Sequence, residues 1–280
     1  MDKYRQFSIA TAPEWREILL AFLAELPFDS FEDTAEGMNA YLPPGADVAA
    51  TELQVRELQS DYPFTYDIVE VEKENWNAVW ESNFQEVRVN DFCGIRAEFH
   101  PPFEGVAHEI VIRPKMAFGT GHHETTWMMM DQMSHLDLKD KRVFDYGCGT
   151  GILAILAAQL GAAGVDAVDN EYPAYENTLE HALLNGVGDK IKAFYGTLDD
   201  VPPATYDLIL ANINRNVILA SLPELRKRLS ANGQLLISGI LHDDEPVIME
   251  MATAQGFREF GQQKRGNWMA ILLSGAEKNL

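Results

Sequence analysis

The segment RVFDYGCGTGILAILAAQLG, residues 142–161, decides the fold class of this 280-residue chain. Its first residues are apolar and end at Asp145, which predicts a buried strand. Gly147, Gly149 and Gly151 then predict a tight turn, and the alanine- and leucine-rich remainder predicts a helix. A strand, a glycine-rich turn and a helix in this order open a nucleotide-binding α/β fold, in which the turn backbone approaches the ligand.

The spacing of the glycines limits the kinds of ligand that the turn could bind. A dinucleotide fingerprint, G-x-G-x-x-G, would need glycine where Ile152 stands, and no Lys-Ser/Thr pair follows to make a phosphate-binding loop. The D-x-G-x-G-x-G pattern instead fits an adenosyl ligand that has no pyrophosphate. If this ligand also carries a carboxylate, the free backbone N–H groups at the start of the following helix can bind it.

Two later strands end in polar side chains that a cofactor of this kind could use. The strand GVDAVD ends at Asp169, whose carboxylate can accept hydrogen bonds from both ribose hydroxyls. Residues 196–198, after the next strand, could border an adenine. The strand YDLILANI, residues 206–213, carries Asn212 at its end, and this amide could hold an incoming nucleophile and the methionine end of the cofactor. Either polar residue could also simply cap the following helix.

A loop upstream, MAFGTGHHETT at residues 116–126, offers hydroxyl and backbone donors just before an apolar helix. The hydroxyls of Thr125 and Thr126 could bind a ligand or cap that helix. His122 and His123 are adjacent, so their side chains point apart, and no carboxylate cluster accompanies them. We therefore expect no metal site.

Composition excludes several classes of protein. The net charge of −21 argues against sequence-independent nucleic-acid binding and against attachment to anionic membranes, both of which need basic residues. Cys93 and Cys148 are the only cysteines, so neither a disulfide framework nor a Cys/His zinc site is expected. The N-terminus lacks the pattern of a signal peptide, and the apolar run around 152–160 is too short to span a bilayer. These features predict a soluble, cytoplasmic protein.

The first third of the chain differs from the rest in its charge and in its predicted order of strands and helices. Residues 1–90 contain 18 acidic and 6 basic side chains, which suggests contact with a basic partner. Hydrophobic periodicity predicts the order β-α-β-β-α-β of a small ferredoxin-like module without a cofactor motif. The predicted elements are a strand at 4–10, a helix from Pro13, a hairpin at 29–42, a helix at 46–59 and a strand at 64–71.

A connector follows the first module. In EKENWNAVWESNF, residues 72–84, Trp76, Trp80 and Phe84 recur every four residues and predict one aromatic stripe of a helix. Beyond it, strands alternate with helices and a closing hairpin, which predicts a mainly parallel sheet. The expected parts are an N-terminal domain at 1–70, with a recognition or a purely structural role, a linker helix at 71–89 and a larger α/β domain at 90–280.

Several segments together resemble one family across essentially the whole chain: NWNAVWESNF, MAFGTGHHETT, VFDYGCGTGILAILAAQLGA, AVDNEYPA, LILANI and LISGIL. The family is that of the ribosomal protein L11 methyltransferases. The resemblance implies an α/β fold with the Rossmann-like seven-stranded sheet of class I S-adenosyl-L-methionine-dependent methyltransferases, and a small N-terminal α+β ferredoxin-like domain that recognises the substrate. The implied reaction is methylation of lysine side chains and of the N-terminal amine of one large-subunit ribosomal protein.

The resemblance also implies site residues, with Asn212 as the catalytic candidate. The positions that match cofactor contacts of the family, or belong to its glycine motif, are Thr120, Gly121, Thr126, Asp145, Gly147, Gly149, Asp169 and Asn212. Where the family usually has Thr-His-Pro, this chain has His-His-Glu at 122–124. The partner implied is a basic, lysine-bearing ribosomal protein, with neither nucleic acid nor membrane bound directly.

Three alternatives stay open from the sequence. The chain could be a class I methyltransferase that acts on another protein, a nucleic acid or a small molecule. It could be a nicotinamide oxidoreductase, although Ile152 disfavours that class. It could also be a non-catalytic binding module, against which the presence of Gly147, Asp169 and Asn212 argues.

Overall fold

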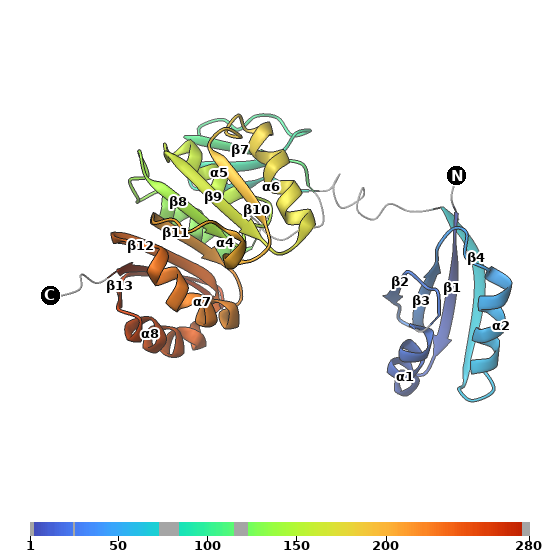
Figure 1. The fold of residues 1–280 in the computed structure, drawn as a ribbon. Coiled ribbons are helices and arrows are strands. Elements are labelled where there is room, and N and C mark those ends of the chain that lie inside the picture. Colours follow the sequence, from blue (N-terminus) through green and yellow to red (C-terminus); the bar gives the residue numbers. More distant parts are fainter. Residues whose placement is uncertain (1–2, 25, 73–83, 115–122, 276–280) are drawn as a thin grey trace. The chain divides into compact units, whose positions relative to one another are not determined.

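The computed structural model describes residues 3–24, 26–72, 84–114 and 123–275. The chain divides into two compact units, Met1–Val79 and Trp80–Leu280, each with its own interior (Figure 1).

The N-terminal unit is a four-stranded antiparallel sheet with two helices. The strand order β2-β3-β1-β4, with the chain order β-α-β-β-α-β, is the ferredoxin-like arrangement that the periodicity predicts. The elements are β1 (Lys3–Thr11), α1 (Pro13–Leu23), β2 (Ser30–Asp33), β3 (Gly37–Leu42), α2 (Val48–Leu58) and β4 (Phe64–Glu72).

The hydrophobic pattern of this unit explains its core. In β1, Phe7 and Ile9 are buried, because alternate residues of a strand face the same side of the sheet. Leu19 and Leu23 of α1 and Val55 of α2 are fully buried in the same cluster. The N-terminal unit therefore has a core of its own.

The C-terminal unit is built on a seven-stranded sheet in the order β10-β9-β8-β11-β12-β14-β13. The central pairs are parallel, and β14 is antiparallel to both of its neighbours, as the predicted closing hairpin requires. The chain steps from β8 outward to β9 and later returns to β11 on the other side of β8, which creates a topological switch point. The strands are β8 (Arg142–Tyr146), β9 (Gly164–Asp169), β10 (Ile191–Tyr195), β11 (Tyr206–Asn212), β12 (Leu229–Leu241), β13 (Phe257–Arg265) and β14 (Trp268–Gly275).

Helices cover both faces of this sheet (Figure 1). Consecutive residues of β8 enter different clusters: Val143 packs with the cluster that includes α4 and α5, and Phe144 packs with the cluster that includes α7 and α8. Such strands are apolar throughout because both faces are covered. The helices are α4 (Glu124–Met133), α5 (Ile152–Gln159), α6 (Tyr172–Leu184), α7 (Arg215–Arg228) and α8 (Glu245–Ala254).

A separate three-stranded sheet precedes α4 in the chain and differs from the predicted simple alternation of strands and helices. Its strands are short, and its parallel pair β6-β7 is joined by a loop that has no helix to mark the crossover in the sequence. The strands are β5 (Val87–Val89), β6 (Cys93–Ala97) and β7 (His108–Ile112). Most of the predicted 72–84 helix lies outside the described residues.

Candidate functional site

The glycine turn joins β8 to α5 at the carboxyl edge of the large sheet. Gly147, Gly149 and Gly151 have φ angles of 75°, 55° and 80°, which side chains of L-residues rarely tolerate. A Cβ atom on Gly147 would lie 2.3 Å from Cγ2 of Ile213. Glycine is therefore required here by backbone conformation and by packing against the residue after β11.

Asp169 ends β9 and binds the turn directly. Its Oδ2 accepts a hydrogen bond from the Gly149 amide at 2.9 Å, and its Oδ1 accepts one from the Glu171 amide at 3.0 Å. A carboxylate oxygen has two acceptor positions, so each oxygen can still accept a bond from a ligand hydroxyl. The amide of Gly196 donates to the Asp169 carbonyl at 2.9 Å, which places the start of segment 196–198 beside the end of β9.

Asp145 is buried at the end of β8, with only 1% of its surface exposed. Its Oδ2 accepts a bond from the Ala154 amide at 3.1 Å, whereas its Oδ1 has no hydrogen-bond partner among the described residues. Burial raises the pKa of the Asp145 carboxyl group to about 7; the Ala154 amide lowers it in part, and the charge of Asp169 raises it further. A buried carboxylate oxygen without a partner is a place for a cationic ligand group.

Asn212, at the end of β11, meets Thr126 of α4. The Asn212 Nδ2 donates to the Thr126 Oγ1 at 3.1 Å, and Thr126 is 3% exposed. This contact joins two residues that stand 86 positions apart in the chain. The helix start is held by His123, whose Nδ1 accepts the Thr125 amide at 3.3 Å and whose ring packs edge-on against Trp268. His123 is thus a helix cap.

Together, these contacts place most of the predicted residues at one edge of the sheet. The strands β9, β8 and β11 are neighbours, and their carboxyl ends bear Asp169, Asp145 and Asn212 at the switch point, where open α/β sheets bind ligands. Thr120 and Gly121 lie outside the described residues. Sequence reasoning missed Thr178, whose Oγ1 donates to the Gly149 carbonyl at 3.1 Å.

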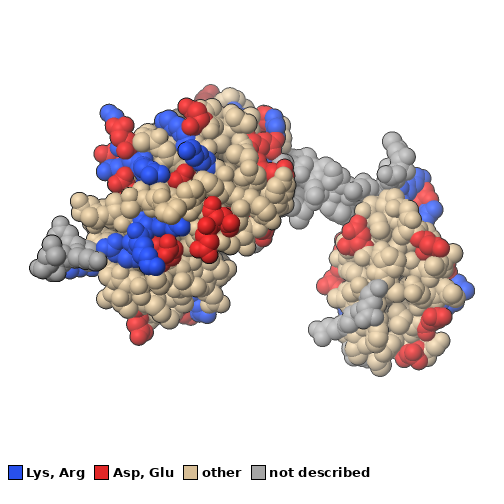
Figure 2. Space-filling model, in the orientation of Figure 1, with Lys and Arg blue, Asp and Glu red and all other residues tan. Residues whose placement is uncertain are grey.

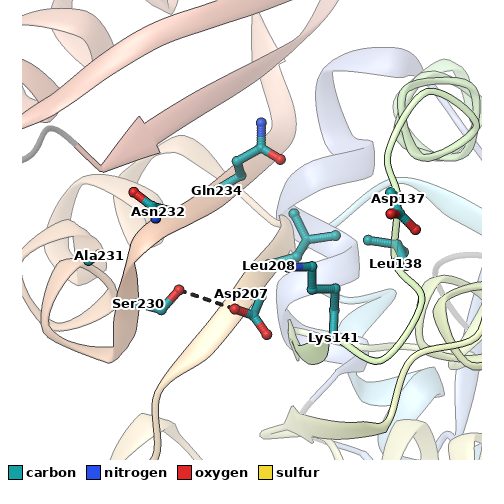
Figure 3. Close-up of a pocket in the computed structure, with 9 residues that line it drawn as sticks. All are labelled: Asp137, Leu138, Lys141, Asp207, Leu208, Ser230, Ala231, Asn232 and Gln234. Carbon is teal, nitrogen blue, oxygen red and sulfur yellow. Dashed lines mark hydrogen bonds between the residues drawn. The ribbon is translucent and has the colours of Figure 1, made fainter.

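A polar cavity of about 370 Å³ lies at the opposite, amino ends of the strands (Figure 3). Asp207 in its wall accepts bonds from the Ser230 hydroxyl and the Arg142 amide, so protein groups already bind its carboxylate. None of the predicted site residues that the structure describes lines this cavity. We assign it no role in the site.

The described residues were also searched for metal-binding clusters and for membrane-spanning helices. Between residues 3 and 275, apart from the undescribed segments, no group of three or more His, Cys, Asp or Glu side chains could hold a metal ion. In the same part of the chain, no helix is long and apolar enough to cross a membrane. Cys93 and Cys148 are both buried and form no disulfide.

The fold and the site define the C-terminal unit as a class I S-adenosylmethionine-dependent methyltransferase. The sheet order, the glycine turn without a dinucleotide fingerprint and the acidic residue at the tip of β9 are features of that class. The family model described as "Ribosomal protein L11 methyltransferase (PrmA)" matches residues 23–275. The chain belongs to the ribosomal protein L11 methyltransferase family.

Individual relatives agree with this assignment. A protein of Porphyromonas gingivalis named ribosomal protein L11 methyltransferase is 41% identical over 264 residues, which is 91% of this chain and 89% of that protein. A Chlorobaculum tepidum protein of the same name is 35% identical and aligns over 92% of this chain and 91% of its own length. The crystal structure of a ribosomal protein L11 methylase from Lactobacillus delbrueckii subsp. bulgaricus superposes with a TM-score of 0.63 at 29% identity, covering 69% of this chain and 99% of that one.

Proposed function

We propose that this protein transfers methyl groups from S-adenosylmethionine to amino groups of ribosomal protein L11, namely lysine side chains and the N-terminal amine. The observation that carries the proposal is the set of Asp169, Asp145 and Asn212 on neighbouring strand ends around the glycine turn. The named relatives, aligned over most of the chain, support L11 as the substrate.

The residues present fit the cofactor by charge and by shape. The Asp145 Oδ1, buried and without a described partner, would accept the α-ammonium group of the methionine moiety. Asp169 would accept the ribose hydroxyls, with its carboxylate already oriented by two backbone amides. Gly147 and Gly149 leave the turn without side chains, so that the backbone can approach the ligand. Charge, hydrogen-bonding capacity and a turn without side chains at Gly147 and Gly149 therefore suit this ligand.

Asn212 and Thr126 would act at the methionine end. The bond from the Asn212 Nδ2 to the Thr126 hydroxyl orients the amide, so that its Oδ1 can accept a bond from an N–H of the substrate amine. Thr126 would also contact the cofactor. The sequence resemblance assigns Thr120 and Gly121 to a loop over the methionine moiety.

The reaction requires alignment more than acid–base chemistry. Bound S-adenosylmethionine would supply a methyl group on a sulfonium: in-line transfer to the amine nitrogen breaks the bond between the methyl carbon and sulfur and leaves the neutral thioether S-adenosylhomocysteine. The protein holds the amine nitrogen opposite the sulfur, and such positioning can account for much of the rate. A lysine amine has a reference pKa of ~10.4 and must lose its proton first. Its burial in the site favours the neutral form, so we assign no general base.

The N-terminal unit would recognise the substrate. Residues 1–90 carry 18 acidic and 6 basic side chains, and acidic groups are spread over the visible face of this unit (Figure 2). A basic, lysine-bearing ribosomal protein would be attracted by this charge, whereas nucleic acid and anionic membranes would be repelled. We place the reaction in the cytoplasm, where ribosomal proteins and S-adenosylmethionine are both present.

The test is labelled-methyl transfer to purified ribosomal protein L11. Fragment mass spectrometry after incubation should locate the label on lysine Nζ atoms and the N-terminal nitrogen. At saturating S-adenosylmethionine, Asn212→Ala should transfer the methyl group more slowly by about tenfold or more, because the amine loses its orienting partner. If the label enters carboxylate, hydroxyl or amide groups instead of amines, the proposal is wrong.

A further inference from the structure

A buried polar stripe on α6 is not explained by the proposed chemistry. Thr178 and His181 of α6 and the half-buried Asn185, which caps its end, recur at helical spacing on one side, next to the buried alanines Ala174 and Ala182. Thr178 and His181 have no exposed surface. Buried polar side chains are unfavourable unless they are hydrogen-bonded, so the partners of this stripe show what it does.

Thr178 and His181 bind two consecutive carbonyl groups of the glycine turn. The Thr178 hydroxyl donates to the Gly149 carbonyl at 3.1 Å, and the His181 Nδ1 lies 2.8 Å from the Thr150 carbonyl. The approach is close, because a Cβ atom on Gly151 would lie 3.0 Å from Thr178. In a trans peptide the C=O and N–H groups point in opposite directions, so the bond at Gly149 also directs the Thr150 N–H away from α6.

The second ring nitrogen of His181 reaches a different part of the unit. The Arg113 amide, just beyond the end of β7, donates to the His181 Nε2 at 3.1 Å. The tautomer with its proton on Nδ1 satisfies this bond and the bond to the Thr150 carbonyl together. One imidazole therefore joins the glycine turn to the small sheet.

Asn185, one turn further along, binds β7 and its own helix. Its Oδ1 accepts the Val111 amide at 2.8 Å, and its Nδ2 donates to the carbonyls of Val111 at 2.7 Å and of His181 at 2.8 Å. β7 lies at one side of its sheet, and this amide pairs with it as a neighbouring strand would. Asn185 thus anchors β7 to α6 through a residue other than Arg113, which makes it a matched control for His181.

We propose that His181 is a positioning residue for the cofactor site: its imidazole fixes the Thr150 carbonyl, and with it the glycine turn, against the edge of β7. This inference rests on the proposed cofactor site, because it assigns the turn to S-adenosylmethionine. A turn held in its binding conformation before the ligand arrives loses less conformational freedom on binding, which increases affinity. His181 would act through the turn and would not touch the ligand.

Three substitutions separate the contact of His181 with Thr150 from its contact with Arg113. His181→Asn places an amide near the position of Nδ1 and can retain the bond to the Thr150 carbonyl. His181→Gln places its amide near the position of Nε2 and can retain the bond to Arg113. His181→Leu removes both. Asn185→Ala removes the bonds to Val111 and to the His181 carbonyl but leaves both imidazole contacts in place, so it controls for loss of stability.

The measurement is the calorimetric Kd of S-adenosylhomocysteine for the full-length variants, with the Tm of each. We expect His181→Leu and His181→Gln to bind about tenfold more weakly than the unaltered protein, the cost of about one buried hydrogen bond. His181→Asn should bind within about twofold, and so should Asn185→Ala despite a lower Tm.

The outcomes that overturn the inference are distinct from failure of the proposed function. If His181→Gln binds as tightly as His181→Asn, or if Asn185→Ala weakens binding as much as His181→Gln, the imidazole has no specific effect on the turn. These two comparisons remain decisive if His181→Leu does not fold. If the unaltered protein itself does not bind S-adenosylhomocysteine, the proposed cofactor site is wrong, and the inference falls with it.

Discussion

At the residue scale, Asp145 shows how packing changes the chemistry of a side chain whose position the sequence predicts. The D-x-G-x-G-x-G pattern predicts the acid at the end of the strand, but no pattern predicts its pKa. The pKa rises to about 7 because the side chain is buried between the strand and α5. Only the folded chain, with the Ala154 amide on one oxygen and no described partner on the other, reveals this property.

The raised pKa predicts that cofactor binding releases a proton in mildly acidic solution. At pH 6 the Asp145 carboxyl group of the free protein is mostly protonated, and a cationic ammonium beside it favours the ionised form, so binding expels the proton. At pH 8 the group is mostly ionised, so proton release should be much smaller than at pH 6. Calorimetry in buffers of different ionisation enthalpy measures this release. Asp145→Asn should abolish it, and a heat independent of buffer at pH 6 would contradict the assignment.

Asp169→Ala is expected to weaken S-adenosylmethionine binding by about tenfold or more. The substitution removes the acceptors for the ribose hydroxyls and also the bond from the Gly149 amide that holds the turn. Asp166→Ala on the same strand is the matched control, because Asp166 binds Tyr206 and Arg142. If calorimetry gave the two variants equal affinity for S-adenosylmethionine, Asp169 would not be a ribose ligand.

At the element scale, apolar segments flanked by turns were predictable, and the three strands of the small sheet were not. The pattern of residues 206–213 predicts a strand that ends near Asn212, and β11 occupies Tyr206–Asn212. In contrast, β5, β6 and β7 have three to five residues each, and their pairing depends on contacts with the rest of the unit. The polar stripe of α6 was equally hidden, because its partners lie far away in the sequence.

Gly147→Ala tests why the turn needs glycine. The added Cβ would strain a φ angle of 75° and clash with Ile213, so we expect a loss of about 3 kcal/mol in the free energy of unfolding. Gly256 has a similar φ of 79°, but a Cβ added there would meet no atom within 4 Å, so Gly256→Ala should cost only about 1 kcal/mol. Urea unfolding measures both. Equal losses of unfolding free energy in the two variants would show that the contact with Ile213 does not add to the need for glycine at position 147.

At the scale of the whole molecule, the separate cores of the two units predict separable functions. Phe7 and Ile9 belong to a cluster within the N-terminal unit, and the clusters on both faces of the large sheet belong to the other unit. Removal of residues 1–72, through the end of β4, should therefore spare S-adenosylmethionine binding and abolish methylation of ribosomal protein L11. Normal methylation by the fragment would show that the N-terminal unit does not recognise the substrate.

The uneven charge predicts salt-dependent encounter with a basic substrate. Attraction between the acidic residues of segment 1–90 and lysine-rich protein is screened beyond about 8–10 Å near physiological ionic strength. Raising salt should therefore lower kcat/KM for L11, chiefly through KM, while the Kd of S-adenosylhomocysteine changes little. A flat salt profile would mean that the acidic residues serve solubility alone.

The proposed activity is methylation of amines on one ribosomal protein. The most direct measurement is a competition in which total ribosomal proteins are incubated with the full-length enzyme and S-adenosylmethionine labelled in the methyl group, followed by mass spectrometry of every protein. We predict label in ribosomal protein L11 alone, on lysine side chains and the N-terminal amine. Label spread over many proteins, or absent from L11, would contradict the account.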